Sequence, residues 1–344
     1  TRVRSSAASD VYKRQSLNFQ PLATSPLHKL YVINCPLKKI DVSPLKNTLT
    51  ELWLGTLQNT YFWEEINHKQ TKPKYQLLDL SKMKKLKRVY ACGVASLKTV
   101  KLKDTKTKQG IRSLLELHLY GTGIRTLDAT AAKNLKRLFV GDRIRKLTVD
   151  KCKKLKEIGV INLGSKQAAT IKSSSVQHIQ YQGKTLKKLS FSKCPKLYTL
   201  SIKCTKVGTV NLRSNKRLHY MTLNSKKTGK VVYPKVSTKG WHDCCDLVET
   251  NYYKNLDEFK NDPDAKGVYK EYVGYILEYP TKILDISAWT SLNKTVKRCM
   301  FGYGDFDHKK CATKKIIINK KLRKADKKWI KKFAKKWHVK VVEK

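Results

Sequence analysis

The chain has 344 residues, and its 40% share of hydrophobic residues excludes wholesale disorder. Lysine and arginine number 74 against 26 aspartates and glutamates, so the formal net charge is +48. A charge of this size predicts polyanionic partners: anionic cell-wall polymer, acidic glycan, a membrane surface or nucleic acid. Most of the basic residues are lysine, whereas bidentate recognition of bases relies on arginine. The composition therefore argues against sequence-specific reading of nucleic acid. No apolar run approaches the roughly 18 residues of a transmembrane helix.

The cysteine count and the start of the chain limit the interpretation further. Nine cysteines, an odd number, exclude a framework in which every thiol is paired within the chain. Residues 1–15 contain no apolar stretch and resemble a leader that recurs on unrelated translated fragments. We expect this segment to be non-native, and the natural N-terminus, with any signal peptide, to be missing.

A short repeat organises the chain from residue 27 onwards. The pattern L-x-x-L-x-L recurs, and the copies that begin at 114, 135, 155, 176, 197 and 218 lie about 21 residues apart. A second series, such as Leu97-Lys-Thr-Val100-Lys-Leu102, is offset by about ten residues. Alternation within each copy points every second side chain inward. The sequence therefore predicts a coil with two extended segments, one on each side, joined by short turns.

This unit resembles the leucine-rich repeat, whose ninth position holds Asn or Cys. Here that position holds Cys35, Cys152, Cys194 and Asn215, and such residues bond the buried backbone of the turn. The recurrent Asp-x-Ser/Thr, as in Asp79-Leu80-Ser81, makes the unit similar to the short repeats of bacterial cell-surface proteins of the internalin type. The resemblance implies a solenoid and a role in recognition without catalysis.

The repeat also predicts domain boundaries. Leucine-rich repeats are expected over 16–234 with an insert at 55–76, then a second insert over 235–280 and a resumed repeat over 281–303. Residues 304–344 are expected to form a strand-helix-strand cap, because apolar residues recur with helical spacing from Leu322 to Trp337. The alternative for this basic amphipathic helix is a position on a membrane surface.

One outward-facing column of the predicted sheet is rich in aromatic residues. In each copy, the residue between the last two apolar positions points away from the core. The first five members of this column are Tyr31, Trp53, Tyr90, His118 and Phe139. We expect them to lie side by side on a concave face, about 4.8 Å apart and interrupted by the first insert, beside a column of alternating charge. The hypothesis is that they form the ligand-binding face; the alternative is that they only stabilise the sheet.

Motifs for catalysis or cofactor binding are missing, so we expect no enzymatic activity and no cofactor. One weak constellation of His and Cys residues remains. Free thiols are the first expectation for its cysteines, with a disulfide or a zinc site as alternatives. Its members are His242, Cys244, Cys245, Cys299, His308 and Cys311.

Together these features predict a binding or adhesion module at a bacterial cell surface or outside the cell. Its expected ligand on the aromatic face is a protein or a glycan, and its lysine-rich exterior would attract anionic wall polymer or acidic glycan. The alternatives are a basic protein that binds nucleic acid nonspecifically, and an enzyme or metal site within 235–311.

Overall fold

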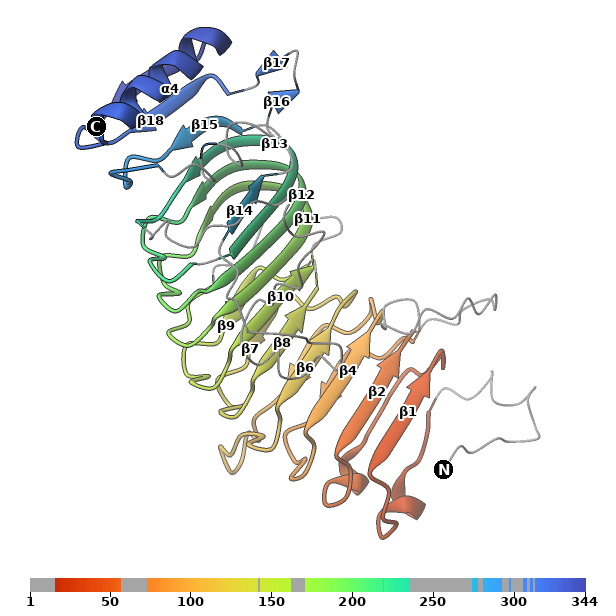
Figure 1. Ribbon diagram of the computed structural model, residues 1–344. Coiled ribbons are helices and arrows are strands. Elements are labelled where there is room, and N and C mark those ends of the chain that lie inside the picture. Colours follow the sequence, from red (N-terminus) through yellow and green to blue (C-terminus); the bar gives the residue numbers. More distant parts are fainter. Residues whose placement is uncertain are drawn as a thin grey trace, which may run out of the picture. The chain divides into compact units, whose positions relative to one another are not determined.

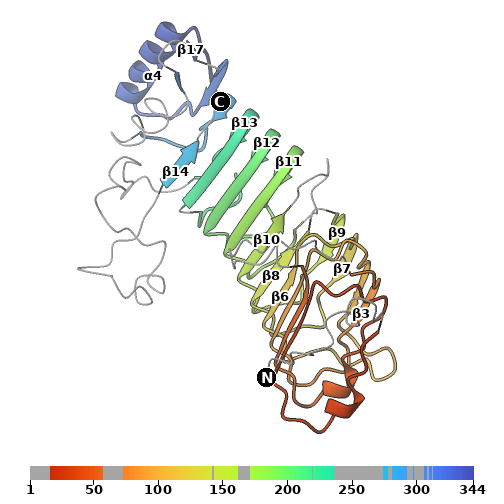
Figure 2. The same ribbon diagram turned by 90° about the vertical axis from the view of Figure 1, so that its right-hand side faces the viewer.

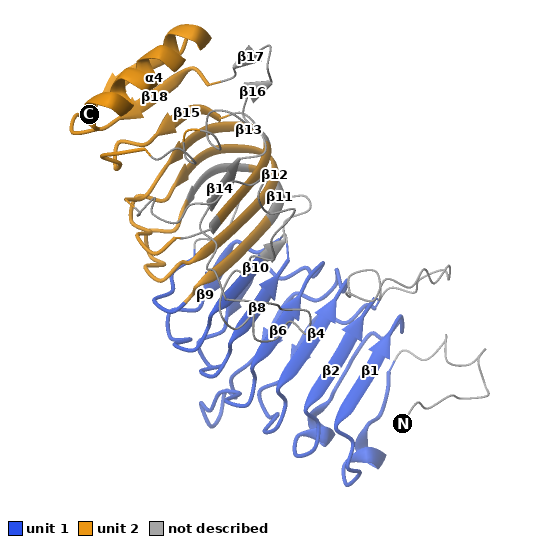
Figure 3. Ribbon diagram, viewed as in Figure 1, with its two compact units in different colours: residues 1–175 blue, residues 176–344 orange. Residues whose placement is uncertain are grey.

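The computed structural model of the protein divides into two compact units, residues 1–175 and 176–344 (Figure 3). The described residues are 16–56, 73–141, 143–161, 171–218, 220–235, 274–277, 281–292, 297, 306–307, 310–311 and 313–344.

Unit 1 is a stack of coils with a parallel strand on one side of each. Neighbouring coils supply neighbouring strands, and the order in the sheet follows the order in the chain (Figure 1). The strands are β1 (Lys29–Ile33), β2 (Glu51–Gly55), β4 (Arg88–Cys92), β6 (Glu116–Leu119), β8 (Arg137–Val140) and β10 (Glu157–Ile161).

The other side of these coils carries shorter strands in two parallel pairs. Figures 1 and 2 show β7 and β9 on one side of the coils and β6 and β8 on the other. The pairs are β3 (Leu77–Asp79) with β5 (Thr99–Lys101), and β7 (Thr126–Asp128) with β9 (Lys146–Thr148). Two 3₁₀ turns, η1 (Gln20–Leu22) and η2 (Ser43–Leu45), precede β1 and β2.

The apolar positions of the repeat fill the core between the two sides. Leu52, Val89, Leu117 and Leu138 are fully buried and lie beside one another in register on β2, β4, β6 and β8. Stacking identical positions in this way buries a continuous core that one coil could not form alone.

Local turn chemistry fixes the corners of the unit 1 coils. Gly93 and Gly121, just after β4 and β6, have φ of 73° and 63°, a left-handed conformation that glycine adopts without steric cost. On the opposite side, Asp79 Oδ1 accepts hydrogen bonds from the backbone N and Oγ of Ser81, and Asp128 binds Thr130 in the same way. The recurrent Asp-x-Ser/Thr is therefore a turn motif.

In unit 2 the two extended segments of a coil fuse into one long strand. The strands β11 (His178–Ser190), β12 (Thr199–Asn211) and β13 (Tyr220–Val232) each have 13 residues and curve around the coil (Figure 1). The positions that match Gly93 and Gly121 hold Gly183, Cys204 and Ser225, which pair with one another in register. The strands continue through this position whether or not it holds a glycine. The two separate segments expected from the sequence are wrong for these coils.

The solenoid of unit 2 continues to a cap. Strand β14 (Gly274–Leu277), within the segment expected to be an insert, pairs with the first half of β13, and β15 (Thr281–Asp285) pairs with its second half. Then β18 (Lys315–Ile318), α4 (Lys324–Trp337) and β19 (Lys340–Glu343) follow, with β18 between β15 and β19. This is the expected strand-helix-strand order.

The described residues confirm the predicted fold class. The chain is a leucine-rich-repeat solenoid of parallel strands, with strands on both sides of its coils and little helix. The ninth-position residues act as expected where their contacts are described: Asn215 Nδ2 donates to the carbonyls of Phe191 and Cys194, and Cys152 Sγ donates to Ala129 O.

Candidate functional site

The five residues of the aromatic column lie together in unit 1, in direct register across five neighbouring strands. Tyr31 pairs with Trp53, Trp53 with Tyr90, Tyr90 with His118, and His118 with Phe139. The expected interruption by the first insert does not occur. Strand β4 pairs directly with β2 because β3, the strand between them in sequence, belongs to the other side of the coil. We call these five residues the aromatic ladder.

The rings of the aromatic ladder are stacked on one another. Their centroids are 5.8 Å apart for Tyr31 and Trp53, 3.9 Å for Trp53 and Tyr90, 4.5 Å for Tyr90 and His118, and 4.7 Å for His118 and Phe139. The planes of consecutive rings differ by 18° to 31°. The inner rings thus cover one another's faces.

Accessibility falls along the aromatic ladder from its first member to its last. Tyr31 is 57% exposed, Trp53 and Tyr90 are half-buried, and His118 and Phe139 are 8% and 6% exposed. The Phe139 ring lies over Gly159 of β10, where a Cβ would meet Cδ1 of Phe139 at 2.2 Å. The missing side chain at Gly159 therefore makes room for this ring. The accessible part of the ladder is Tyr31, Trp53 and Tyr90, which we call the aromatic strip.

Sequence reasoning missed Tyr120, which closes the buried end of the ladder. Its ring lies 5.6 Å from that of Phe139 and 5.9 Å, edge-on, from that of His118. With Cys92 and Phe139 it forms a small buried cluster. Tyr120 follows β6 at the corner, so the alternation of the strand does not reveal which way its ring points.

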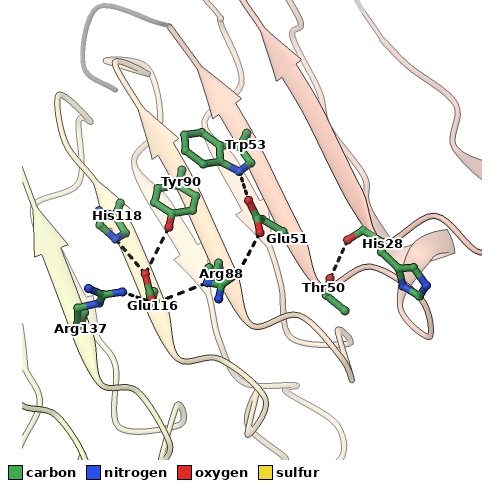
Figure 4. A network of polar contacts seen from close by, with 9 residues as sticks. All are labelled: His28, Thr50, Glu51, Trp53, Arg88, Tyr90, Glu116, His118 and Arg137. Atoms are coloured by element: carbon green, nitrogen blue, oxygen red, sulfur yellow. Dashed lines mark hydrogen bonds and ion pairs between the residues drawn. The ribbon is translucent and has the colours of Figure 1, made fainter. Parts of the chain in front are cut away.

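A row of side chains with alternating charge lies beside the aromatic ladder and forms hydrogen bonds with the polar atoms of the ladder (Figure 4). Glu51 accepts hydrogen bonds from Trp53 Nε1 at 2.6 Å and from Arg88 Nη1 at 3.1 Å. Glu116 Oε2 accepts one from the Tyr90 hydroxyl at 3.3 Å. Two carboxylates thus hold two rings of the aromatic strip in place.

Glu116 is the centre of this network. Arg137 Nη2 donates to its Oε1, Arg88 Nε lies 3.6 Å from the same atom, and His118 Nε2 lies 3.8 Å from Oε2. The contact with His118, followed by those with Arg137, lowers the pKa of Glu116 to about 2. Burial, reinforced by the negative charge of Glu116, raises the pKa of Tyr90 to about 12. Glu116 is therefore ionised and Tyr90 is uncharged at neutral pH.

The His and Cys constellation lies almost entirely outside the described residues. Only Cys311 is placed, in the short strand β17 (Lys310–Cys311), which pairs with β16 (Phe306–Asp307). Among the described residues, no group of three or more His, Cys, Asp or Glu could hold a metal ion.

Four of the described cysteines are free thiols. They are Cys35, Cys92, Cys152 and Cys204. Burial raises the pKa of Cys92 and of Cys152 to about 12, so these two are uncharged and poorly nucleophilic at neutral pH.

The fold defines this chain as a leucine-rich-repeat solenoid with an aromatic ladder on one sheet. No protein-family model matches its sequence, and no curated protein is significantly similar to it. Among eleven solved chains that match, one is the functional domain of InlJ from Listeria monocytogenes, which includes a cysteine ladder. The match has 13% identity, covers 81% of this chain and 68% of the other, and has a TM-score of 0.27.

The helices of the described residues include none that is long and apolar enough to cross a membrane.

Proposed function

We propose that this chain is a non-enzymatic recognition module, and that a protein ligand binds the aromatic strip Tyr31, Trp53 and Tyr90 of unit 1. The observation that carries the proposal is the combination of accessibility and rigidity in this strip. Tyr31 is 57% exposed, and Trp53 and Tyr90 are half-buried and held by Glu51 and Glu116. Aromatic side chains that are already ordered lose little entropy on binding and contribute large contact areas.

The stacking favours a protein over a glycan as the ligand. A sugar ring binds an aromatic residue by lying on the face of its ring, but Trp53 and Tyr90 cover each other at 3.9 Å. Trp53 and Tyr90 therefore present ring edges, and not free faces, beside the charged side chains of Glu51 and Arg88. Such a surface suits side chains of a partner protein, with apolar groups against the edges and charged groups at Lys29 and Arg88.

The proposal also places the protein at a cell surface or outside the cell and gives its lysine-rich surface a role in attachment. The similarity of the repeat to those of bacterial surface proteins supports a role at a cell surface or outside the cell. The charge of +48 supports attachment to anionic wall polymer or acidic glycan. Binding to nucleic acid remains the rival, and the residues of an enzyme or metal site within 235–311 fall almost wholly outside the described structure.

A comparison of two libraries tests the proposed ligand class. The chain is screened against a displayed peptide library and a neutral glycan array in about 1 M salt, where the Debye length is about 3 Å and nonspecific attraction is screened. We expect peptide ligands whose affinity falls about tenfold or more in a Tyr31→Ala variant. Gln180→Ala is the matched control, because Gln180 is exposed and occupies the same repeat position on β11 of unit 2.

Two outcomes would contradict the proposal. Glycan ligands that depend on Tyr31 would assign the strip to carbohydrate. Ligands affected equally by Tyr31→Ala and Gln180→Ala, or ligands affected by neither change, would remove the strip as the binding surface.

A further inference from the structure

A basic hollow lies over β3 in unit 1, on the side of the coils that carries the short strands. It has a volume of about 860 Å³. Four lysines, Lys38, Lys39, Lys74 and Lys82, line it, and all four are exposed. Its apolar lining includes Ile40 and Leu77, and Leu77 is one of the few large hydrophobic residues with high exposure, at 41%. The sequence shows no local signal for this hollow, because its lysines come from two coils.

The positive charge of the hollow is only partly neutralised by carboxylates in its lining. The four lysines form no ion pair within the described part of the chain. The two carboxylates in the lining, Asp41 and Asp79, are used in turns, where they accept backbone hydrogen bonds from Ser43 and Ser81 at 2.9 and 3.0 Å. The ammonium groups are therefore available to an anionic ligand.

A second hollow continues the first. Lys82 lines both, and the second adds Lys46, Lys84 and Arg112 within about 520 Å³. Its carboxylate, Asp104, accepts backbone hydrogen bonds from Lys106 and Thr107, which lower its pKa. Together the two hollows hold seven cationic residues against three carboxylates, a local net charge of +4. Two hollows that share a residue suit an extended ligand.

We propose that these two hollows bind an acidic polysaccharide, with its anionic groups at the lysines and an apolar face of a sugar ring against Ile40 and Leu77. Lysine, a hydrated point charge on a flexible stem, suits irregularly spaced anionic groups. Single-stranded nucleic acid fits less well, because its bases need exposed aromatic platforms. The aromatic residue in this lining, Tyr75, is only 2% exposed. The site is separate from the aromatic strip and does not rest on the function proposed for it.

Matched charge variants of the full chain test the site. The first replaces Lys39, Lys74 and Lys82 by glutamine, and the control replaces Lys133, Lys153 and Lys154, which are exposed and line neither hollow. Both variants lose three positive charges. Binding is measured to polygalacturonate, to neutral dextran and to single-stranded DNA over a range of salt concentrations.

The first variant should bind polygalacturonate on the order of 30-fold more weakly at physiological salt. The slope of log K against log salt is negative, and its magnitude should decrease by about two, at roughly 0.7 for each lost contact. The control should change affinity by less than about threefold. Equal losses in both variants would overturn the proposal, because they would mean that total charge alone drives binding.

A second variant tests the apolar part of the site. Leu77→Ala removes an exposed side chain and should leave the fold and the salt slope unchanged while weakening binding of polygalacturonate. No effect of Leu77→Ala on polygalacturonate binding would overturn the assignment of a sugar face to this lining. DNA that binds as tightly as polygalacturonate, with the same dependence on Lys39, Lys74 and Lys82, would instead assign the site to nucleic acid.

Discussion

At the scale of single residues, the structure shows how a strongly basic chain uses its few carboxylates. Glu116 and Glu51 are almost fully buried on the outer face of the β1–β10 sheet, and each contacts at least one arginine and one aromatic residue of the ladder. Burial of a charge is tolerated only where hydrogen bonds and opposite charges replace water. These carboxylates therefore have two effects. They hold rings of the aromatic ladder in place, and they offset the positive charge of the neighbouring arginines.

Replacement of Glu116 should change how stability depends on pH. The pKa of Glu116 is about 2 in the folded protein and near 4.5 when unfolded, so its contribution is present above pH 4.5 and is lost as the pH falls towards 2. We expect Glu116→Gln to lower the free energy of unfolding by roughly 2 kcal/mol at pH 7. Urea unfolding of both proteins measures the difference, which should shrink steadily below pH 4.5.

The control for this measurement is Asp150→Asn, at an exposed position outside the network. A Glu116→Gln protein whose stability differs from that of the parent by the same amount at pH 7 and at pH 2 would contradict the role given to Glu116.

At the scale of elements, the cap of unit 2 depends on a buried aspartate. Asp326, in the first turn of α4, is 0% exposed and accepts hydrogen bonds from Arg323 Nε at 3.0 Å and from the backbone N of Leu292 at 3.0 Å. Lys297 Nζ lies 2.7 Å from its other oxygen. Burial raises the pKa of Asp326, but these contacts outweigh burial and lower it overall. Leu292 and Lys297 lie outside the cap, so Asp326 helps to join α4 to the preceding segment, together with the hydrogen bond from Arg323 Nη2 to Leu292 O.

Loss of the Asp326 carboxylate should loosen the cap before the rest of unit 2. Asp326→Asn removes the charge that faces Arg323 and Lys297, and we expect it to cost about 2–4 kcal/mol. Hydrogen exchange should report faster opening of β18 and β19 than of β12.

The matched control is Glu343→Gln, which removes an exposed partner of Lys327 and should leave the stability of the cap nearly unchanged. If the two changes accelerate exchange equally, the buried network does not secure the cap.

At the scale of the whole molecule, charge repulsion is the dominant long-range term. The excess of 74 basic over 26 acidic side chains far exceeds what the ion pairs can neutralise, and most lysines of the described residues lie on the surface. Repulsion of this kind destabilises the compact state and attracts anions. It also explains why the hollows over β3 can remain positive: few carboxylates are available to pair with their lysines.

Salt should therefore stabilise this protein. Raising the salt concentration from about 10 mM to about 150 mM shortens the Debye length from about 30 Å to about 8 Å, and we expect the Tm to increase by several degrees. Thermal unfolding followed by circular dichroism measures the change. A variant with Lys133, Lys153 and Lys154 replaced by glutamate carries less repulsion and should gain less from salt. A Tm that falls with salt would mean that surface ion pairs outweigh the repulsion.

The repeat pattern alone predicts the solenoid, the inward positions and the membership of the aromatic ladder. Each follows from a local pattern that repeats, because parallel stacking places the same position of every coil in register. Leu117, Leu138 and Asn215 could be assigned to the core in this way.

The accessibility of the ladder residues and the positions of the hollows depend instead on packing between coils. Burial of Phe139 depends on Gly159 and Tyr120, which belong to another coil and to a corner. Lys39 and Lys82 line the same hollow because of the way in which successive coils stack. Such properties arise from side chains distant in sequence, so a pattern that describes one repeat at a time does not contain them.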